Sequence, residues 1–103
     1  PYGLDYVASK AAVIGMTRGM ARELGRDRIR VNAVAPSAVM TEGTEEFFGE
    51  KLEKAKKVIA SGQVIPRNLE TSDVTGTVLY LASDASAFVT GQTHMVDGGS
   101  WFL

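Results

Sequence analysis

The stretch YVASK, residues 6–10, places a tyrosine four positions before a lysine. Residues four apart lie one above the other on one face of an α-helix, so Tyr6 and Lys10 can share a site if this stretch is helical. A phenol beside an ammonium is a candidate proton donor or acceptor. The spacing alone is weak support, because such a pair also arises by chance. The surrounding elements must decide between a reactive pair and an ordinary helix-surface pair.

A phenol needs help to act as a base near neutral pH. Its ordinary pKa is about 10, so its pKa must fall by about three, which corresponds to about 4 kcal/mol. An ammonium about 4.5 Å away supplies about 3.7 kcal/mol at an effective dielectric constant near 20, but only about 1 kcal/mol in bulk water. The pair is therefore predicted to work only in a partly sheltered site.

The elements around this pair follow an α/β pattern. Over residues 5–24, small and apolar residues recur mostly at helical spacing, which predicts an amphipathic helix that Gly25 ends in the left-handed conformation. IRVNAVAP, residues 29–36, is rich in valine and alanine, and Pro36 must end it, so it predicts a strand buried on both faces. Helix followed directly by buried strand is the repeat unit of parallel α/β sheets.

The second half of the chain predicts two more helices and a strand. Residues 44–61 carry an apolar stripe with acids at the start and lysines 54, 56 and 57 toward the end, which suits a helix dipole; Gly62 and Pro66 close this helix. A helix over 72–82 contains Gly76, which we interpret as a mark of close packing. THMV, residues 93–96, predicts the last strand, with His94 an ordinary strand residue and DGG ending it in a turn.

Composition excludes several classes of protein. The chain of 103 residues suits one small domain, and its 12 acidic and 11 basic residues give a net charge of -1, so no nucleic-acid partner is predicted. Without cysteine and with one histidine, it offers no disulfide, thiol nucleophile or thiolate metal site, and we expect no metal. It has neither a long apolar run nor signal-peptide features, so we expect no membrane partner and a cytoplasmic location.

Several segments together resemble one family. YVASKAAVIGMTRGMARELG, IRVNAVAPSAVMT and LYLASDASAFVTGQTHMVDGG follow in this order on the expected helix, strand, helix and strand. Over nearly the whole chain they resemble the C-terminal half of the short-chain dehydrogenase/reductase family. The resemblance implies an α/β fold, the C-terminal part of a Rossmann-like doubly wound parallel sheet. Residues 1–103 would be the C-terminal portion of a single NAD(P)-binding domain. Motifs in register are far more specific than the tyrosine and lysine alone.

The resemblance implies a role for each site residue. Tyr6 would exchange a proton with the substrate oxygen while NAD or NADP carries the hydride, and Lys10 would also hold the nicotinamide ribose. The backbone of PSAVMT, which includes Pro36 and Ser37, would lie along the nicotinamide. Val39 would meet the carboxamide through its main chain and Thr41 through its hydroxyl. Ligands of open α/β sheets do bind beyond the carboxyl ends of the strands.

Ser37 departs from the glycine that most family members carry. If this position needs a positive φ, serine would be strained there. PSAVMT together with IPRNLETSDVTG is more similar to the secondary-alcohol and aryl-ketone branch of the family than to its acyl-carrier reductases. The resemblance thus implies a small alcohol or ketone substrate and a homodimer or homotetramer. Phe47 and Phe48 could line the substrate pocket or simply pack on the body of the protein.

The family's remaining machinery lies upstream of Tyr6. Its members are longer, and a glycine-rich turn that holds the pyrophosphate, a catalytic serine and an asparagine precede the tyrosine. We therefore expect a piece of a longer enzyme, whose activity as an isolated fragment stays open. The alternative is a truncated, noncatalytic relative that acts as an interaction module. A strand edge left unpaired in the fragment predicts association.

Overall fold

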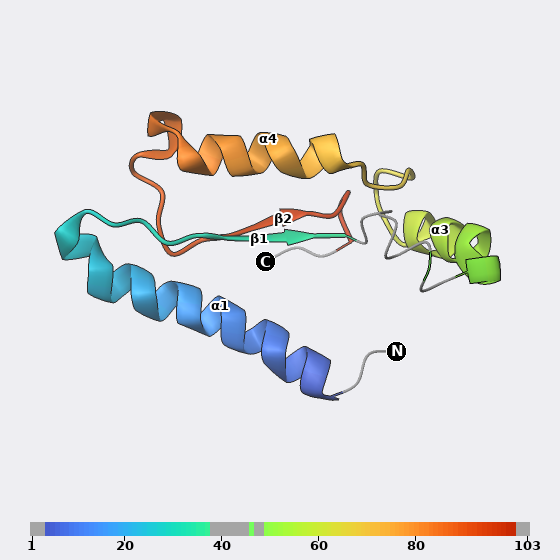
Figure 1. Ribbon diagram of the computed structural model, residues 1–103, viewed down its shortest axis with the longest axis horizontal. Coiled ribbons are helices and arrows are strands. Elements are labelled where there is room, and N and C mark those ends of the chain that lie inside the picture. Colours follow the sequence, from blue (N-terminus) through green and yellow to red (C-terminus); the bar gives the residue numbers. More distant parts are fainter. Residues whose placement is uncertain (1–3, 38–45, 47–48, 101–103) are drawn as a thin grey trace. The chain divides into compact units, whose positions relative to one another are not determined.

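The computed structural model describes residues 4–37, 46 and 49–100 (Figure 1). The described elements are the helices α1 (Leu4–Leu24), α3 (Leu52–Ser61) and α4 (Thr71–Ala82), the strands β1 (Ala33–Pro36) and β2 (Thr93–Val96), and the 3-10 turns η1 (Gly25–Asp27), η2 (Gly49–Lys51) and η3 (Asp84–Ser86). They divide into two compact units. The first joins the chain up to Val34 with Leu79–His94, and the second joins Ala35–Val78 with the chain from Met95 on.

Helix α1 confirms the first predicted helix. Thr17 and Ala21 are buried on one of its faces, and the Thr17 hydroxyl donates a 2.7 Å hydrogen bond to the Val13 carbonyl. A Cβ at Gly91, in the loop before β2, would lie 3.4 Å from the Ala21 Cβ, so α1 packs closely on that loop. Other apolar side chains of α1, including Met16, are exposed, so its apolar surface is wider than the face that packs.

The end of α1 differs from the prediction. Gly25 does not adopt the left-handed conformation; it begins η1, and Arg28 has the positive φ of 59° instead. The Arg28 N–H donates to the Gly25 carbonyl at 3.0 Å, and the Ile29 N–H donates to the Leu24 carbonyl at 3.2 Å. The chain therefore adds one tighter turn before it reverses, and these two bonds satisfy carbonyls that the helix leaves open.

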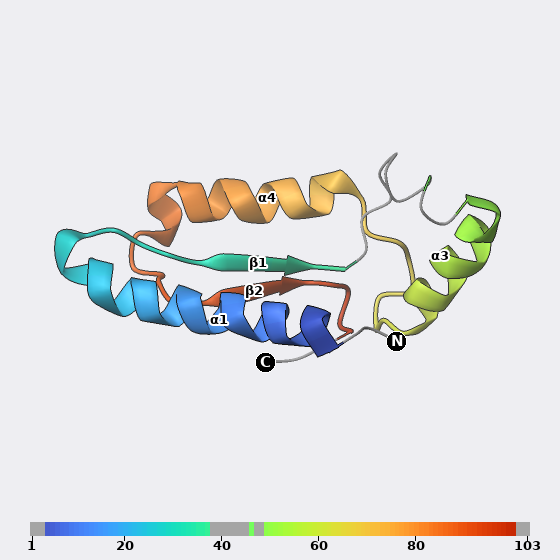
Figure 2. The ribbon, with the colours of Figure 1, turned by 60° about the horizontal axis from the view of Figure 1, so that its bottom comes forward.

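Strands β1 and β2 pair in parallel, as the α/β pattern predicts. The Ala33 N–H donates to the Gln92 carbonyl at 2.9 Å, and the Ser37 N–H donates to the Val96 carbonyl at 3.0 Å. Both partners advance by four residues, which only parallel strands do. In Figure 1, the first-unit ends of β1 and β2 lie between α1 and the last turn of α4; in Figure 2, β1 again lies between them, and β2 passes behind α1.

Strand β1 is shorter than predicted, because residues 30–32 bond to a loop instead of a ladder. The Thr90 hydroxyl accepts the Val31 N–H at 3.0 Å, and the Asn32 amide donates to the Val89 carbonyl at 2.9 Å. The strand residues are half-buried, apart from exposed Pro36, so the expected burial on both faces is absent from the described part of the chain.

Arg30 anchors this irregular stretch. Its guanidinium donates to the Ser86 hydroxyl at 2.8 Å and to the Leu81 carbonyl at 3.0 Å, with longer bonds of 3.4 Å to the Ser83 and Val89 carbonyls. Leu81 lies in the last turn of α4, where carbonyls lack helical partners and a cation is favourable. Arg30 therefore ties the segment before β1 to the end of α4 within the first unit.

The segment after β1 confirms only part of the second predicted helix. Helix α3 covers Leu52–Ser61, and Gly62 follows it as predicted, whereas Phe47 and Phe48 lie outside the described residues. The last turn of α3 contains no basic residue. The predicted match of lysines to the helix dipole is therefore wrong, because the helix ends well beyond them.

Helix α4 confirms the prediction over 72–82, and its first turn is capped. The Asp73 carboxylate accepts the Glu70 N–H at 2.8 Å, while the Asp73 N–H donates to the Glu70 carbonyl at 3.0 Å. This is the reach-back half of a capping box. A Cβ at Gly76 would meet no described atom within 4 Å, so the close packing predicted at this glycine is wrong for the described chain.

Candidate functional site

Positions 6 and 10 both lie in the helical backbone of α1, four residues apart, as YVASK predicts. The residues four, seven and eleven positions after Lys10 are the half-buried Ile14 and the buried Thr17 and Ala21. Residues at these intervals share one helix face. The pair therefore stands on the N-terminal continuation of the face by which α1 packs. The side chain of Tyr6 lies outside the described residues.

Lys10 is exposed. The Coulomb argument requires partial shelter for the pair, since water reduces the attraction about fourfold relative to an effective dielectric constant of 20. The described residues do not bury Lys10 in that way. A working pair would need something besides the described residues, such as a bound ligand, to exclude water from this end of α1.

Pro36 and Ser37 stand at the carboxyl end of β1, the edge at which α/β sheets bind ligands. Ser37 is half-buried, and its hydroxyl donates to Gln63 Oε1 at 2.9 Å. Among the described residues other than glycine, only Arg28 has a positive φ, so Ser37 is free of the strain that a left-handed position would impose. Val39 and Thr41 lie outside the described part of the chain.

Gln63 is a residue that our sequence analysis missed. Its side-chain amide accepts the Ser37 hydroxyl and donates to two carbonyls, those of Ile65 at 3.0 Å and Arg67 at 2.7 Å. Ser37 lies 26 positions before Gln63. No local signal in SGQVIPRN indicates such a distant partner.

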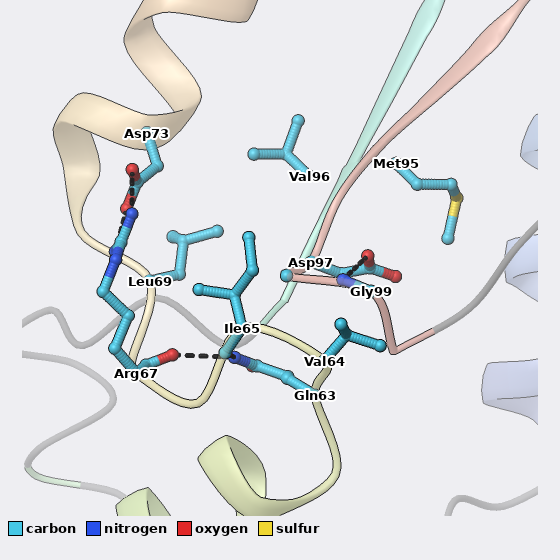
Figure 3. A pocket seen from close by; sticks show the side chains of 11 residues that line it. Gln63, Val64, Ile65, Arg67, Leu69, Asp73, Met95, Val96, Asp97 and Gly99 are labelled. Atoms are coloured by element: carbon cyan, nitrogen blue, oxygen red, sulfur yellow. Dashed lines mark hydrogen bonds and ion pairs between the residues drawn. The ribbon is translucent and has the colours of Figure 1, made fainter.

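A pocket of about 410 Å³ lies beside this network in the second unit (Figure 3). Its lining residues are Gln63, Val64, Ile65, Arg67, Leu69, Asp73, Met95, Val96, Asp97, Gly98 and Gly99. Of the predicted site residues that the structure describes, none lines this pocket. Ser37 is bonded to two lining residues, because its hydroxyl donates to Gln63 and its N–H donates to the Val96 carbonyl.

Two charged side chains that line this pocket, Arg67 and Asp73, form an ion pair with each other. Both Arg67 end nitrogens donate to the Asp73 carboxylate at 2.8 Å, as Figure 3 shows. The bonds from Arg67 are the main reason why the pKa of Asp73 lies well below its usual range, and the bond from the Glu70 N–H lowers it further. The same ion pair raises the pKa of Arg67. The Arg67 and Asp73 side chains are 56% and 27% exposed, so solvent screens the pair and its contribution to stability is small.

The turn after β2 forms another wall of the pocket and confirms the predicted DGG turn. Asp97 is buried, and its carboxylate accepts the Gly99 N–H at 3.0 Å. Gly98 and Gly99 have positive φ values of 62° and 86°, which glycine adopts without steric cost. The Ile65 N–H donates to the Gly98 carbonyl at 2.8 Å, which joins this turn to the segment of Gln63.

The described residues, 4–37, 46 and 49–100, offer neither a metal-binding cluster nor a membrane-spanning helix. No group of three or more histidine, cysteine, aspartate or glutamate residues there could hold a metal ion. None of the described helices is long and apolar enough to cross a bilayer. His94 lies in β2 as predicted, and its Nδ1 is a buried atom without a hydrogen-bond partner among the described residues.

Comparison with known sequences identifies the family. The sequence model of a family described as enoyl-(acyl carrier protein) reductase matches residues 1–100, nearly the whole chain. The chain belongs to the short-chain dehydrogenase/reductase family. This family membership confirms the resemblance on which the predicted site rests; the roles of the individual site residues stay predictions.

Two curated short-chain dehydrogenase/reductase relatives illustrate the match. The chain is 44% identical over 99 residues to the 3-oxoacyl-[acyl-carrier-protein] reductase FabG of Thermotoga maritima, covering 96% of this chain and 39% of that protein. It is 37% identical over 103 residues to the A-factor type gamma-butyrolactone 1'-reductase of Streptomyces virginiae, covering 100% of this chain and 40% of that protein. The chain thus spans about two fifths of the length of these relatives.

Solved structures of the family share the fold. The structure of 4-hydroxyisoleucine dehydrogenase complexed with NADH superposes with a TM-score of 0.80 at 41% identity, over 92% of this chain and 38% of that one. The predicted fold class is confirmed: the chain is α/β, with a parallel sheet like those of its Rossmann-fold relatives. Its placement in the C-terminal part of a longer sheet stays a prediction. The named relatives include an acyl-carrier reductase and a butyrolactone reductase, so they do not single out the predicted secondary-alcohol branch.

Proposed function

We propose that this chain is the C-terminal portion of the catalytic domain of an NAD(P)-dependent oxidoreductase. The enzyme would transfer a hydride between NAD or NADP and the carbon of a secondary alcohol or ketone. The observation that carries the proposal is the helical placement of positions 6 and 10 on one face of α1 in a chain of this family. The relative solved with NADH supports a nicotinamide cofactor.

Tyr6 is assigned the proton transfer. Its phenolate takes the hydroxyl proton when an alcohol is oxidised, and its phenol returns that proton to the oxygen when a ketone is reduced. The Lys10 ammonium, one helical turn away, stabilises the phenolate and holds the ribose hydroxyls of the cofactor. The nicotinamide, when bound, supplies or accepts the hydride.

The end of β1 is assigned to the nicotinamide. The Ser37 N–H and hydroxyl are both engaged by the protein, so we assign Ser37 a backbone role and not a side-chain contact to the cofactor. Pro36 would shape the same backbone, while Val39 and Thr41 would bind the carboxamide. The position beyond the carboxyl end of a parallel strand supports this assignment.

The wider setting belongs to the same proposal. The partners would be a small-molecule alcohol or ketone and further copies of the chain in a homodimer or homotetramer. The location would be the cytoplasm. Residues 1–103 would complete a single domain together with an upstream cofactor-binding half.

The decisive experiment is the substitution Tyr6→Phe in the full natural polypeptide. Oxidation of NADH and NADPH is followed at 340 nm with a panel of ketones, and reduction of NAD and NADP with secondary alcohols. Loss of the general acid and base should lower kcat by about 10²- to 10⁴-fold while cofactor binding persists. Tyr80→Phe, at an exposed tyrosine of α4, is the matched control and should retain activity. An active Tyr6→Phe enzyme would contradict the assigned role.

The second candidate is a noncatalytic interaction module. The observation that favours it is the exposure of Val13, Met16 and Met20 at intervals of three and four residues along α1. Apolar side chains at this spacing form one surface that a partner could cover. A full polypeptide that binds neither nicotinamide cofactor, but associates through this surface, would favour the module over the enzyme.

A further inference from the structure

We infer that Gln63 is a positioning residue that fixes Ser37, and through Ser37 the start of the segment assigned to the nicotinamide. The inference rests on the proposed function, because that function assigns residues 36–41 to the cofactor. Gln63 would contact no reacting atom and would act through Ser37.

Ser37 is held from two sides. Its N–H donates to the Val96 carbonyl of β2 at 3.0 Å, which extends the parallel ladder by one residue beyond β1. Its hydroxyl donates to Gln63 Oε1 at 2.9 Å. The first bond fixes the backbone relative to β2, and the second fixes the side chain relative to the segment after α3. Together they fix Ser37 relative to both elements.

The orientation of the Gln63 amide is itself determined. A glutamine amide has two donor hydrogens on Nε2 and acceptor lone pairs on Oε1. Nε2 donates to the Ile65 and Arg67 carbonyls at 3.0 and 2.7 Å, and a flipped amide would place its oxygen against both carbonyls. Oε1 must therefore face Ser37, so the acceptor is already in place for the serine hydroxyl.

The turn after β2 supports the amide from another side. A Cβ at Gly98 would lie 2.9 Å from Gln63 Nε2 and 3.3 Å from the Ile65 carbonyl oxygen. The turn therefore approaches Gln63 as closely as a glycine permits, and the bond from the Ile65 N–H to the Gly98 carbonyl holds it there. Gln63 thus joins the end of β1, the 63–67 segment and the turn after β2, all within the second unit.

Loss of this network should affect cofactor binding more than chemistry. A backbone that is already ordered adds no ordering entropy to the cost of binding, whereas a loosened backbone must be ordered by the ligand. Without the Gln63 bond, the cofactor would have to order Ser37 itself. The Kd and KM for the cofactor should rise, while kcat at saturating cofactor should change much less.

The test compares Ser37→Ala and Gln63→Met in the full natural polypeptide. The Kd for NADH and NADPH is measured by cofactor fluorescence, kcat and KM by absorbance, and Tm by calorimetry. Each substitution should raise the cofactor Kd about three- to tenfold, the range that one hydrogen bond supplies. The double variant should bind no more weakly than the weaker single variant, because both remove the same bond. Ser37→Thr retains the hydroxyl and should restore binding.

Two control variants separate positioning from general stability. Ser61→Ala removes a hydroxyl bond of 2.8 Å to the Val58 carbonyl in α3, and Gln92→Met removes an amide bond of 3.3 Å to the Thr90 carbonyl. Both should leave the cofactor Kd unchanged. Ser37→Ala deletes a single oxygen atom and carries the test if Gln63→Met does not fold.

The outcomes are distinct. If the wild-type polypeptide binds neither NADH nor NADPH, the proposed function is wrong and the inference is wrong with it. If the wild type binds a cofactor and Ser37→Ala binds equally well, only the inference is wrong. Additive losses in the double variant, or equal losses in the control variants, would also overturn it.

Discussion

At the scale of single residues, two adjacent glycines have the most demanding surroundings. Gly99 has a φ of 86°, and a Cβ added there would lie 2.9 Å from the Val64 Cβ. Gly98 has a φ of 62° and faces Gln63 as closely. A side chain at either position would therefore be strained by its backbone and by its neighbour at once.

Gly99→Ala should destabilise the protein by about 1–3 kcal/mol, because alanine resists the positive φ and its methyl group would displace Val64. Gly76→Ala in α4 is the matched control. It introduces the same methyl group into helical backbone with no described atom within 4 Å, so it should stabilise by about 0.5–1 kcal/mol. Urea unfolding of both variants measures the difference. Equal effects of the two substitutions would show that the turn tolerates a side chain.

At the scale of elements, the beginning of α4 depends on one carboxylate. Asp73 accepts bonds from the Glu70 N–H and from Arg67, so it caps the helix and holds the preceding segment to it. That segment is part of the pocket wall in Figure 3. The ion pair is screened by solvent and adds little to stability, while the cap satisfies the Glu70 N–H before the helix.

The bonds that Asp73 accepts from Arg67 and from the Glu70 N–H predict a pH dependence of stability. The pKa of Asp73 is lower in the folded protein than its ordinary value, so the stability that it contributes is present above about pH 4 and is lost as the pH falls through the folded value. The difference in unfolding free energy between wild type and Asp73→Asn should therefore be constant from pH 5 to pH 8 and should shrink in more acidic buffer. A difference that grows toward acidic pH would reverse the assigned sign.

Elements with local signals could be predicted from the sequence. Helices α1 and α4 and strand β2 follow periodic patterns with starts and stops in the sequence itself, and their bounds agree with prediction to within one residue. The sequence could not predict that residues 29–32 stay outside the strand expected over 29–36, because Arg30 bonds to acceptors more than fifty residues away. Gln63 was missed for the same reason. The predictions for Val39 and Thr41 stay predictions, since the structure does not describe these residues.

At the scale of the whole molecule, each compact unit is built from two segments that are distant in sequence. The first unit carries a surface on α1 that its own residues leave uncovered. Val13, Met16 and Met20 are 54%, 58% and 39% exposed. Both readings of the function, a homo-oligomeric enzyme and an interaction module, predict that another protein surface covers these side chains.

Met16→Gln combined with Met20→Gln should therefore weaken association of the full natural polypeptide, because polar side chains gain little from burial without partners. Sedimentation velocity over a range of concentrations measures the change. Lys54→Gln combined with Lys57→Gln, on exposed positions of α3, is a control that changes side chains of similar length elsewhere. Unchanged association of the methionine variant would show that this surface of α1 is not an interface.

The anchor formed by Arg30 also has a consequence for the order of events on the ribosome. The Leu81 carbonyl is made 51 residues after Arg30, and the Ser86 hydroxyl 56 residues after it. At about 5–20 residues per second, Arg30 is synthesised roughly 3–10 seconds before its acceptors exist. During that interval the ribosome synthesises Ala35–Val78, which is the internal segment of the second unit. The first unit, although it contains the earlier residues, can close only after most of the chain has been translated.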